Sequence, residues 1–262
     1  MLRVHEISSL YLGVPRRITV WLPPGSRRRV RVGLPVLYLN DGQNLFDPGR
    51  AFAGATWRVA ETADWLVRRR HIPPVLIVGI DHGSERRGRE YLPVEDDRNP
   101  GTERPLNREY AEFVTREVMP LVVREYRAAR GPAATAFGGS SYGALAALNT
   151  ALVKPGVFGR LLLESPSLYV GDEYVLRKAR RQTRWPARIY LGVGTAETSR
   201  ADWNEETVVN VLKLEAVLRR AGLGPRRLAV AIEPGATHSE AAWAGRFMRA
   251  LEFLYGAGQT RG

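Results

Sequence analysis

Short runs of β-branched and aliphatic residues alternate with longer amphipathic segments along most of the chain. Most of the short runs are apolar at consecutive positions, which is typical of strands buried on both faces of a parallel sheet. Strands are therefore predicted at residues 16–23, 34–40, 74–80, 134–140, 160–165, 188–194 and 227–234.

The longer segments repeat their apolar residues at the helical period of about 3.6. They predict helices at residues 57–70, 107–127, 142–153, 205–222 and 239–256. Pro120 has no amide hydrogen and is expected to kink or divide the second of these helices. Because strands and helices alternate, we expect an α/β fold: a mostly parallel sheet with helices on both faces, preceded by an antiparallel start over residues 2–22.

No internal repeat, low-complexity segment or linker divides the 262 residues, so a single domain over residues 1–262 is expected. The longest irregular segment, 81–106, is rich in glycine, proline and charge. It follows a predicted strand, and loops at the carboxyl ends of such strands build the ligand crevice of open α/β sheets.

Charge introduces a competing hypothesis, because the formal net charge is +12. Three of the 39 basic residues are lysines, which leaves 36 arginines. A basic protein raises nucleic acid as a partner. The arginines are scattered among apolar residues, however, and no helix-turn-helix or RNA-recognition signature accompanies them. Solvated helix faces explain this distribution more simply, and no nucleic-acid partner is expected.

Other features narrow the class of protein. No apolar run approaches the roughly 18 residues that span a bilayer, so no membrane association is expected. The segment MLRVHEISSL lacks the features of a signal peptide, which favours a cytoplasmic location. The absence of cysteine excludes disulfides, thiolate zinc sites and a cysteine nucleophile. No metal or organic cofactor is implied, and the oligomeric state is left open.

The strongest chemical signal is AFGGSSYGALAAL, residues 136–148, where a strand passes at once into a helix. Residues 139–143 fit the G-x-S-x-G pattern of a nucleophile elbow, with Ser141 at its centre. The sharp turn requires small residues two positions away on either side, and Gly139 and Gly143 meet that need. Centring the motif on Ser140 would place Tyr142 at one of these positions. A glycine-rich turn without chemistry is the alternative.

A serine nucleophile needs a base, and the chain has four histidines. In α/β-hydrolases the order along the chain is serine, acid, histidine, with the histidine after the last strand. Only His238 satisfies this order. The acid should follow the penultimate strand, where Glu197 stands, and Asp202 and Glu164 are rivals. Glu233, still on its strand, is expected to be structural.

These motifs resemble the putative esterase family of α/β-hydrolases, which includes enterobactin esterases, mycobacterial mycolyltransferases and S-formylglutathione hydrolases. The resemblance covers nearly all of the chain, and within the family the chain most resembles the compact bacterial enterobactin-esterase-like hydrolases. It rests on LYLNDGQNLF (37–46), GIDHGSERRGREYLP (79–93), GGSSYG (138–143), ESPSLY (164–169), GVGTAE (192–197) and GATHSEAAW (235–243). Ala144 stands where the family often has glycine.

The resemblance implies an oxyanion hole built from the backbone amides of Gln43 and Tyr142. Independently, Asp41-Gly42 forms a turn at a strand's carboxyl edge, where such an amide should lie. The resemblance also implies that Arg87 contacts substrate, although a surface salt bridge to Glu85 or Glu90 fits equally well.

Three further residues, Trp57, Ser167 and Tyr169, are candidates for the substrate pocket or for packing.

The sequence therefore predicts a serine carboxylic-ester hydrolase that acts on a small-molecule ester through Ser141, His238 and Glu197. One alternative is an acyltransferase with the same site. Another, of a different class, is a basic nucleic-acid-binding protein on an inactive hydrolase scaffold.

Overall fold

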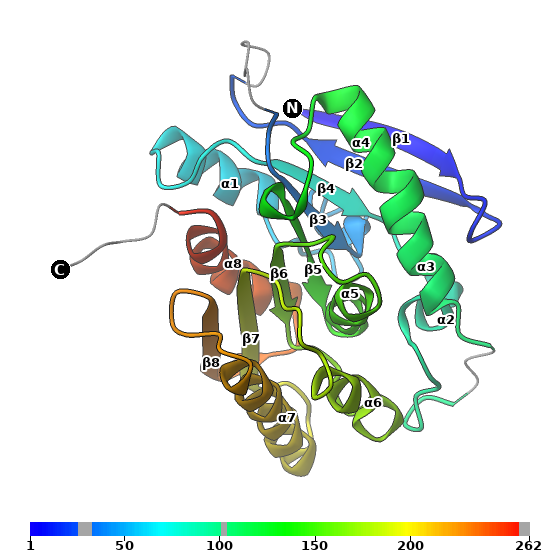
Figure 1. Ribbon diagram of the computed structural model, residues 1–262, viewed down its shortest axis with the longest axis vertical. Helices are drawn as coiled ribbons and strands as arrows, with labels where there is room; N and C mark the ends of the chain where they lie inside the picture. Colours follow the sequence, from blue (N-terminus) through cyan, green and yellow to red (C-terminus); the bar gives the residue numbers. More distant parts are fainter. Residues whose placement is uncertain (26–32, 101–103, 257–262) are drawn as a thin grey trace.

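The computed structural model describes residues 1–25, 33–100 and 104–256. Within these ranges the strands form one eight-stranded sheet in the order β1-β2-β4-β3-β5-β6-β7-β8 (Figure 1). The strand bounds are β1 Leu2–Ser8, β2 Pro15–Trp21, β3 Val36–Asn40, β4 Leu76–Ile80, β5 Thr135–Ser140, β6 Arg160–Glu164, β7 Arg188–Ala196 and β8 Leu228–Thr237.

Strand direction follows the predicted plan. β1 pairs antiparallel with β2, and β2 pairs antiparallel with β4. From β4 to β8 every neighbouring pair is parallel. All residues of β3, β4 and β5 are buried, which explains why their sequences are apolar without alternation. The prediction of a mostly parallel α/β sheet with an antiparallel start is confirmed.

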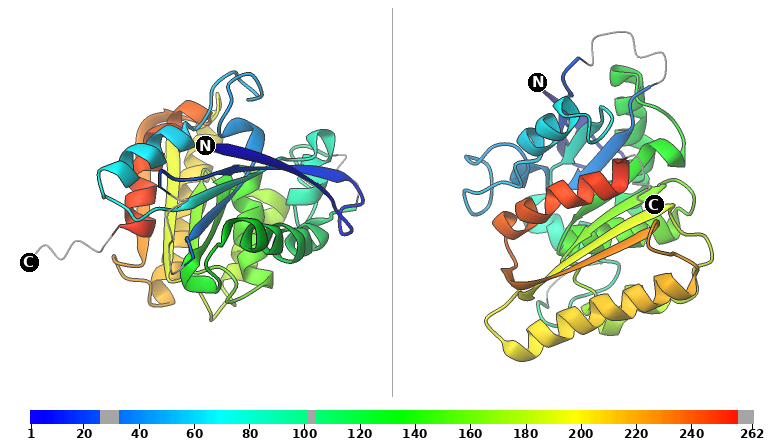
Figure 2. Two further views of the ribbon diagram at one scale, coloured as in Figure 1. Left: turned by 90° about the horizontal axis from the view of Figure 1, so that it is seen from above. Right: turned by 90° about the vertical axis from the view of Figure 1, so that its left-hand side faces the viewer.

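Helices cover both faces of this sheet, as the views in Figure 2 show. Helices α1 and α8 pack against each other and cover one face of the sheet, where α8 lies against β6 and β7. Helices α3, α5, α6 and α7 lie on the other face, with α5 against β5 and β6 and α7 against β7. The bounds are α1 Val59–Arg68, α2 Arg87–Tyr91, α3 Asn107–Phe113, α4 Met119–Tyr126, α5 Tyr142–Val153, α6 Val170–Ala179, α7 Ala201–Arg220 and α8 Glu240–Tyr255.

The helix predicted at 107–127 runs from Asn107 to Tyr126 without a break in helical backbone, so Pro120 does not divide it. A π-helical turn, Val114–Val118, lies between α3 and α4, and Pro120 occupies the first turn of α4. The π-helical segment ends just before Pro120, which has no amide hydrogen to donate to the turn before it. Two helices were not predicted, namely α2, which is only five residues long, and α6, whose residues Gly171–Glu173 have positive φ.

The topology brings the candidate chemistry to one edge of the sheet. Because parallel strands end at the same edge, the loops that follow β3, β5, β6, β7 and β8 meet there. Those loops carry, in turn, the Asp41 turn, Ser141, Ser165, Glu197 and His238. The site is thus assembled from segments that are far apart in the sequence.

Candidate active site

Ser141 occupies the turn between β5 and α5. Its φ of 55° and ψ of −128° lie in a region that side chains other than glycine rarely adopt. Such strain persists only when the surroundings enforce it, and it is concentrated at functional sites. The Ser141 amide donates a 2.9 Å hydrogen bond to the Glu164 carbonyl, which ties the turn to β6. Ser140, by contrast, is the last residue of the strand and is buried.

The glycines on either side of Ser141 are required by space. A Cβ on Gly139 would lie 3.0 Å from both the Asn40 Cβ and the Gly143 carbonyl carbon. A Cβ on Gly143 would lie 2.7 Å from an Asp41 carboxylate oxygen. The contact at Gly143 is shorter than a Cβ tolerates, and the two contacts at Gly139 are at the tight limit of about 3 Å, so both positions favour glycine. The steric argument that centres the elbow on Ser141 agrees with this geometry.

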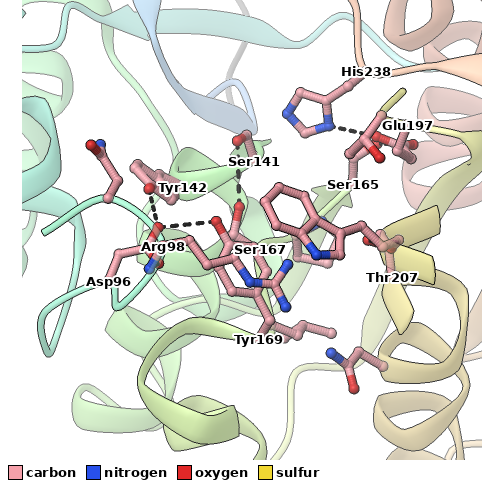
Figure 3. A pocket seen from close by; sticks show the side chains of 16 residues that line it. Asp96, Arg98, Ser141, Tyr142, Ser165, Ser167, Tyr169, Glu197, Thr207 and His238 are labelled. Atoms are coloured by element: carbon pink, nitrogen blue, oxygen red, sulfur yellow. Dashed lines mark hydrogen bonds and ion pairs between the residues drawn. The ribbon is translucent and has the colours of Figure 1, made fainter. Parts of the chain in front are cut away.

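A cavity of about 280 Å³ opens in front of Ser141 (Figure 3). Serine, histidine and glutamate all contribute to its wall, together with several aromatic and polar side chains. The lining residues are Asp96, Arg98, Asn99, Ser141, Tyr142, Ser165, Pro166, Ser167, Leu168, Tyr169, Glu197, Thr198, Trp203, Thr207, Asn210 and His238.

His238 follows the last strand and is hydrogen-bonded to Glu197. The distance from its Nδ1 to Glu197 Oε2 is 2.5 Å. Figure 3 shows the imidazole between Ser141 and Glu197, with its second ring nitrogen turned toward the serine. Trp243 of α8 meets the ring edge to face, at 5.0 Å between centroids, and so limits its rotation. The histidine is thus held on one side by a carboxylate and on another by an indole.

Glu197 is buried and accepts three hydrogen bonds. Besides His238, Ser165 Oγ donates to Oε1 at 2.7 Å and the Gly194 amide donates to the same oxygen at 2.5 Å. Burial by itself would raise the pKa of Glu197, but the hydrogen bonds from His238, Ser165 and Gly194 outweigh it and the pKa is lowered. The carboxylate therefore stays ionised beside the imidazole at neutral pH.

The rival carboxylates have other partners. Asp202 is exposed and pairs with Arg200 at 2.5 Å. Glu164 lies in a fully buried ion pair with Arg246 at 2.8 Å, and Glu233 also pairs with Arg246, at 2.9 Å. Among the described residues, Glu197 alone of these four carboxylates is hydrogen-bonded to His238.

The remaining histidines lie outside the cavity. His5 contacts the Tyr126 hydroxyl at 2.5 Å, and His71 contacts Glu252 at 2.8 Å on the surface. His82 accepts a 2.9 Å hydrogen bond from the Ser84 amide through Nδ1, and burial lowers its pKa. Of the four histidines, the cavity wall includes His238 only.

The turn after β3 carries Gln43. Asp41 has a left-handed backbone, with φ 56°, and caps the 3₁₀ turn Gly42–Asn44. The side-chain oxygen of Gln43 accepts a 3.1 Å hydrogen bond from the His82 amide, so this side chain serves the loop after β4. Tyr142 begins α5, where the first amides have no carbonyl within the helix to bond. Both predicted backbone donors therefore lie in first turns beside the elbow.

Two of the predicted pocket residues line the cavity. Ser167 Oγ lies 3.4 Å from Ser141 Oγ. The Tyr169 hydroxyl donates to Asp96 Oδ2 at 3.0 Å, and the Tyr142 hydroxyl donates to the same oxygen (Figure 3). Trp57 is not a lining residue. It is buried behind the site at 2% exposure, against Trp243 and Phe247, which is the packing alternative given for it above.

Arg87 is not among the residues that line this cavity. Within the described residues its ion-pair partner is Asp41 rather than Glu85 or Glu90, so the surface salt bridge given as the alternative is not formed. The substrate contact implied by the resemblance stays a prediction. Glu90 is instead paired with Arg16 at 2.7 Å and Arg86 at 3.2 Å.

Several residues of the cavity were missed by the sequence reasoning. Asp96 is buried, and Arg98 lies over the rings of Tyr169, at 3.9 Å, and Trp203, at 4.6 Å. Ser165 links Glu197 to the Trp243 indole, which donates to Ser165 Oγ at 3.0 Å. The available signal was position: residues 96 and 98 lie in the segment 81–106, and 165 immediately follows a strand.

No group of three or more histidine, aspartate or glutamate side chains within residues 1–25, 33–100 and 104–256 is arranged to hold a metal ion. In the same ranges, none of the helices combines the length and the apolar character that a bilayer-crossing segment needs.

Comparison with proteins of known sequence and structure shows what this chain is similar to. The chain is 24% identical over 250 residues to the uncharacterized protein YbbA of Bacillus subtilis (strain 168), covering 94% of each. It is 25% identical over 212 residues to the ferri-bacillibactin esterase BesA of the same organism, covering 73% of this chain and 70% of BesA.

Among solved structures, the enterobactin esterase FES of Shigella flexneri superposes with a TM-score of 0.75 at 21% identity. The match covers 97% of this chain but 58% of the FES chain, so the present chain spans just over half of that protein. The fold is therefore that of these α/β-hydrolases. The model of the family described as "Putative esterase" matches residues 9–254. The chain belongs to the putative esterase family.

Proposed function

We propose that the protein is a serine carboxylic-ester hydrolase that works through an acyl-enzyme. One observation carries the proposal. A strained serine at a strand-to-helix elbow shares a cavity with His238, and Nδ1 of that histidine is 2.5 Å from the buried carboxylate of Glu197. Nucleophile, base and orienting acid in this arrangement are the parts of a catalytic triad.

In the first step Ser141 Oγ attacks the ester carbonyl carbon. His238 Nε2 takes the hydroxyl proton, since Nδ1 is occupied by Glu197. The ionised Glu197 fixes the tautomer in which Nδ1 carries hydrogen, and it stabilises the imidazolium that forms. The lowered pKa of Glu197 is consistent with this role because a protonated acid could not supply it.

The negative charge that develops on the carbonyl oxygen needs donors that are already in position. We assign these to the backbone amides of Gln43 and Tyr142, at the first turns that follow β3 and β5. The positive end of α5 adds to the stabilisation. Removing a single donor of this kind costs about 10²- to 10³-fold in kcat in a comparable enzyme.

The alcohol then leaves with the proton held by His238, and Ser141 carries the acyl group. Water, deprotonated by the same histidine, attacks the acyl-enzyme and releases the acid. The residues of the site supply every proton transfer, so the reaction needs no cofactor. An acyltransferase would differ only in using an acceptor alcohol in place of water.

For the substrate, we propose an ester with an aromatic acyl group that carries hydroxyl or negative groups. The cavity offers the rings of Tyr142, Tyr169 and Trp203 as walls. The guanidinium of Arg98 and the carboxylate of Asp96 provide polar groups beside them. A solved structure of the enterobactin esterase FES of Shigella flexneri in the presence of 2,3-di-hydroxy-N-benzoyl-glycine supports a ligand with a hydroxylated ring.

A panel of p-nitrophenyl, aryl and catechol-bearing esters tests the proposal. The wild type should hydrolyse at least one of them, and Ser141→Ala should reduce the rate by about 10⁴-fold or more. Ser140→Ala is the matched control and should keep most of the activity. Adding acceptor alcohols shows whether the acyl group passes to water or to an alcohol.

Two results would contradict the proposal. The first is hydrolysis by Ser141→Ala at the wild-type rate. The second is failure of the wild type on the whole panel, accompanied by a salt-dependent shift of DNA in a gel. That second result would favour the inactive-scaffold alternative.

A further inference from the structure

A buried ion pair lies behind the two turns assigned to the oxyanion hole. Arg87, the first residue of α2, binds the Asp41 carboxylate with two parallel hydrogen bonds. Nε donates to Oδ1 at 2.7 Å and Nη2 donates to Oδ2 at 2.9 Å. This bidentate geometry is the strongest form of arginine–carboxylate pair and fixes orientation as well as distance. Only 25% of the Arg87 side chain and 6% of that of Asp41 are exposed.

Asp41 holds the turn that carries Gln43. Its φ of 56° and ψ of 48° are left-handed, and its carbonyl accepts the Asn44 amide at 2.9 Å to close the turn. An aspartate tolerates this conformation better than most residues, but it still costs free energy and must be maintained by its surroundings. The Arg87 pair and a 3.2 Å hydrogen bond from the Asp41 amide to the Tyr91 hydroxyl provide that constraint.

The Asp41–Arg87 ion pair also contacts the second turn, the one that begins α5. A Cβ on Gly143 would lie 2.7 Å from Asp41 Oδ2, so this carboxylate packs directly on the first turn of α5. The Arg87 guanidinium lies between two aromatic rings, 5.2 Å from the centroid of Tyr91 and 5.4 Å from that of Tyr142. These are cation–π distances. Arg87 thus contacts Asp41 and Tyr142, one residue from each turn.

We propose that Arg87 is a positioning residue that keeps the Gln43 and Tyr142 amides at a fixed separation through its contacts with Asp41 and Tyr142. The inference rests on the proposed function. It assigns Arg87 to transition-state stabilisation through other residues, and not to contact with substrate. Preorganised amides are effective because they need no rearrangement when the charge appears, so loosening either turn should lower kcat.

Other charges nearby already have partners. Arg16 and Arg86 are bound to Glu90, and Arg50 is paired with Asp81. None of them is paired with Asp41 in the part of the chain that the structure describes. Arg86 precedes Arg87 and bonds Glu90 and the Leu12 carbonyl, so it helps to hold α2 without touching either turn. It offers a matched control.

The first experiment measures kcat and KM for Arg87→Ala, Arg87→Lys and Arg86→Ala on a short neutral ester and on an aryl ester. Arg87→Ala should lower kcat by about 10- to 100-fold on both esters, less than complete loss of an oxyanion donor. KM should change by less than about twofold. Arg87→Lys keeps the positive charge but loses the planar guanidinium that binds both carboxylate oxygens. Its kcat should therefore lie between those of the wild type and Arg87→Ala. Arg86→Ala should keep kcat near the wild type.

Two readouts separate positioning from a general loss of structure. Methylguanidinium should restore part of the kcat of Arg87→Ala and none of any loss in Arg86→Ala. Amide hydrogen exchange over residues 41–45 should speed up in Arg87→Ala, with β4 and β5 unchanged. Exchange does not require turnover, so it tests the inference even if the proposed ester chemistry fails.

Three outcomes would overturn the inference. One is unchanged exchange over residues 41–45 in Arg87→Ala. Another is a KM increase on the aryl ester alone, which would make Arg87 a substrate contact. The third is an equal kcat loss in Arg86→Ala and Arg87→Ala, which would assign the effect to α2 as a whole. A wild type that hydrolyses no ester contradicts the proposed function, and the exchange result then stands separately.

Discussion

Glu164 and Glu197 stand at the ends of neighbouring strands, yet their surroundings differ. Glu164 ends β6 and is completely buried beside Arg246, with Oε1 lacking a hydrogen-bond partner among the described residues. Burial raises its pKa to about 7 against the opposing effect of Arg246. Glu197 directly follows the next strand, β7, and accepts hydrogen bonds from His238, Ser165 and Gly194, which lower its pKa despite its burial.

The difference shows that burial alone does not set the role of a carboxylate. Glu197 lies in the cavity wall and is paired with His238, whose side chain is about one-third exposed. The Glu164 side chain faces an arginine in the interior, and Glu164 is not among the residues that line the cavity. Two titratable groups whose environments separate their pKa values often divide the work of a site. Here we infer a catalytic role for Glu197 and a structural role for Glu164.

The largest expected effect is on kcat. Glu197→Gln keeps the shape of the side chain but loses the charge that selects the histidine tautomer. The analogous change in a serine protease costs about 10⁴-fold, and a loss of that order is expected. Glu164→Gln should retain most of the activity.

Asp202→Asn is the second control because Asp202 is exposed and paired with Arg200. Steady-state kinetics of the three variants on one ester decide the assignment. Collapse of Asp202→Asn or Glu164→Gln, with near-normal Glu197→Gln, would transfer the acid role.

The next effect is on stability. Arg246→Met removes the partner of a fully buried carboxyl group, which must then stay charged without a partner or take up a proton as its pKa rises further. Such a change typically costs about 3–5 kcal/mol in the free energy of unfolding. Urea unfolding measures it. Adding Glu164→Gln to Arg246→Met should recover part of the loss because the unpartnered carboxyl group is gone. A double variant that is less stable than Arg246→Met alone would contradict the claim that Glu164 and Arg246 form a mutually dependent ion pair.

A smaller effect is expected at Ser165, which connects Glu197 to Trp243. Ser165→Ala removes a hydrogen bond to an ionised carboxylate, a contact worth about 1.5–3 kcal/mol. If a similar share is felt in the transition state, kcat should fall about tenfold or more. Thr198→Ala, a change to another hydroxyl residue of the cavity wall, should have little effect and is the control. Unchanged kcat in Ser165→Ala would remove Ser165 from the triad's support.

The smallest effect is in the pH dependence of stability, and it has opposite sign for the two carboxylates. The folded-state pKa of Glu197 is below its ordinary value of 4.5, so its contribution is present above pH 4.5 and lost as the pH falls through the folded pKa. The raised pKa of Glu164 favours the protonated form, so the folded state loses stability as the pH rises from 4.5 to about 7.

Unfolding free energies measured across pH separate the two. Glu197→Gln should flatten the decline below pH 4.5, and Glu164→Gln should flatten the decline between pH 4.5 and 7. The same pH profile for both variants would contradict the comparison.

The sequence predicted the parts of the molecule that depend on local rules. Buried strands are recognisable from unbroken apolar runs, and the elbow from the two glycines that the Asn40 and Asp41 contacts require. Chain order selected His238 and Glu197, which the structure brings within 2.5 Å. Such order is informative because parallel strands deliver their ends to one edge.

The sequence could not predict the features that depend on contacts between side chains far apart along the chain. Arg87 has Glu90 three residues away, within reach on one helix, yet it pairs with Asp41 across the fold because Arg16 and Arg86 already occupy Glu90. Trp57 was a pocket candidate, and it packs behind Trp243 instead. Arg98 and Asp96 lie in a segment without periodicity, so nothing in its pattern indicated which side chains face the cavity.

The most direct test of the proposed triad maps a covalent label. A fluorophosphonate reacts with a serine only where a base activates it, and peptide mass spectrometry identifies the modified residue. We expect the label on Ser141 in the wild type and in Ser140→Ala, no label in Ser141→Ala, and slow labelling in Glu197→Gln. A label on Ser140, or labelling of Glu197→Gln at the wild-type rate, would contradict the account.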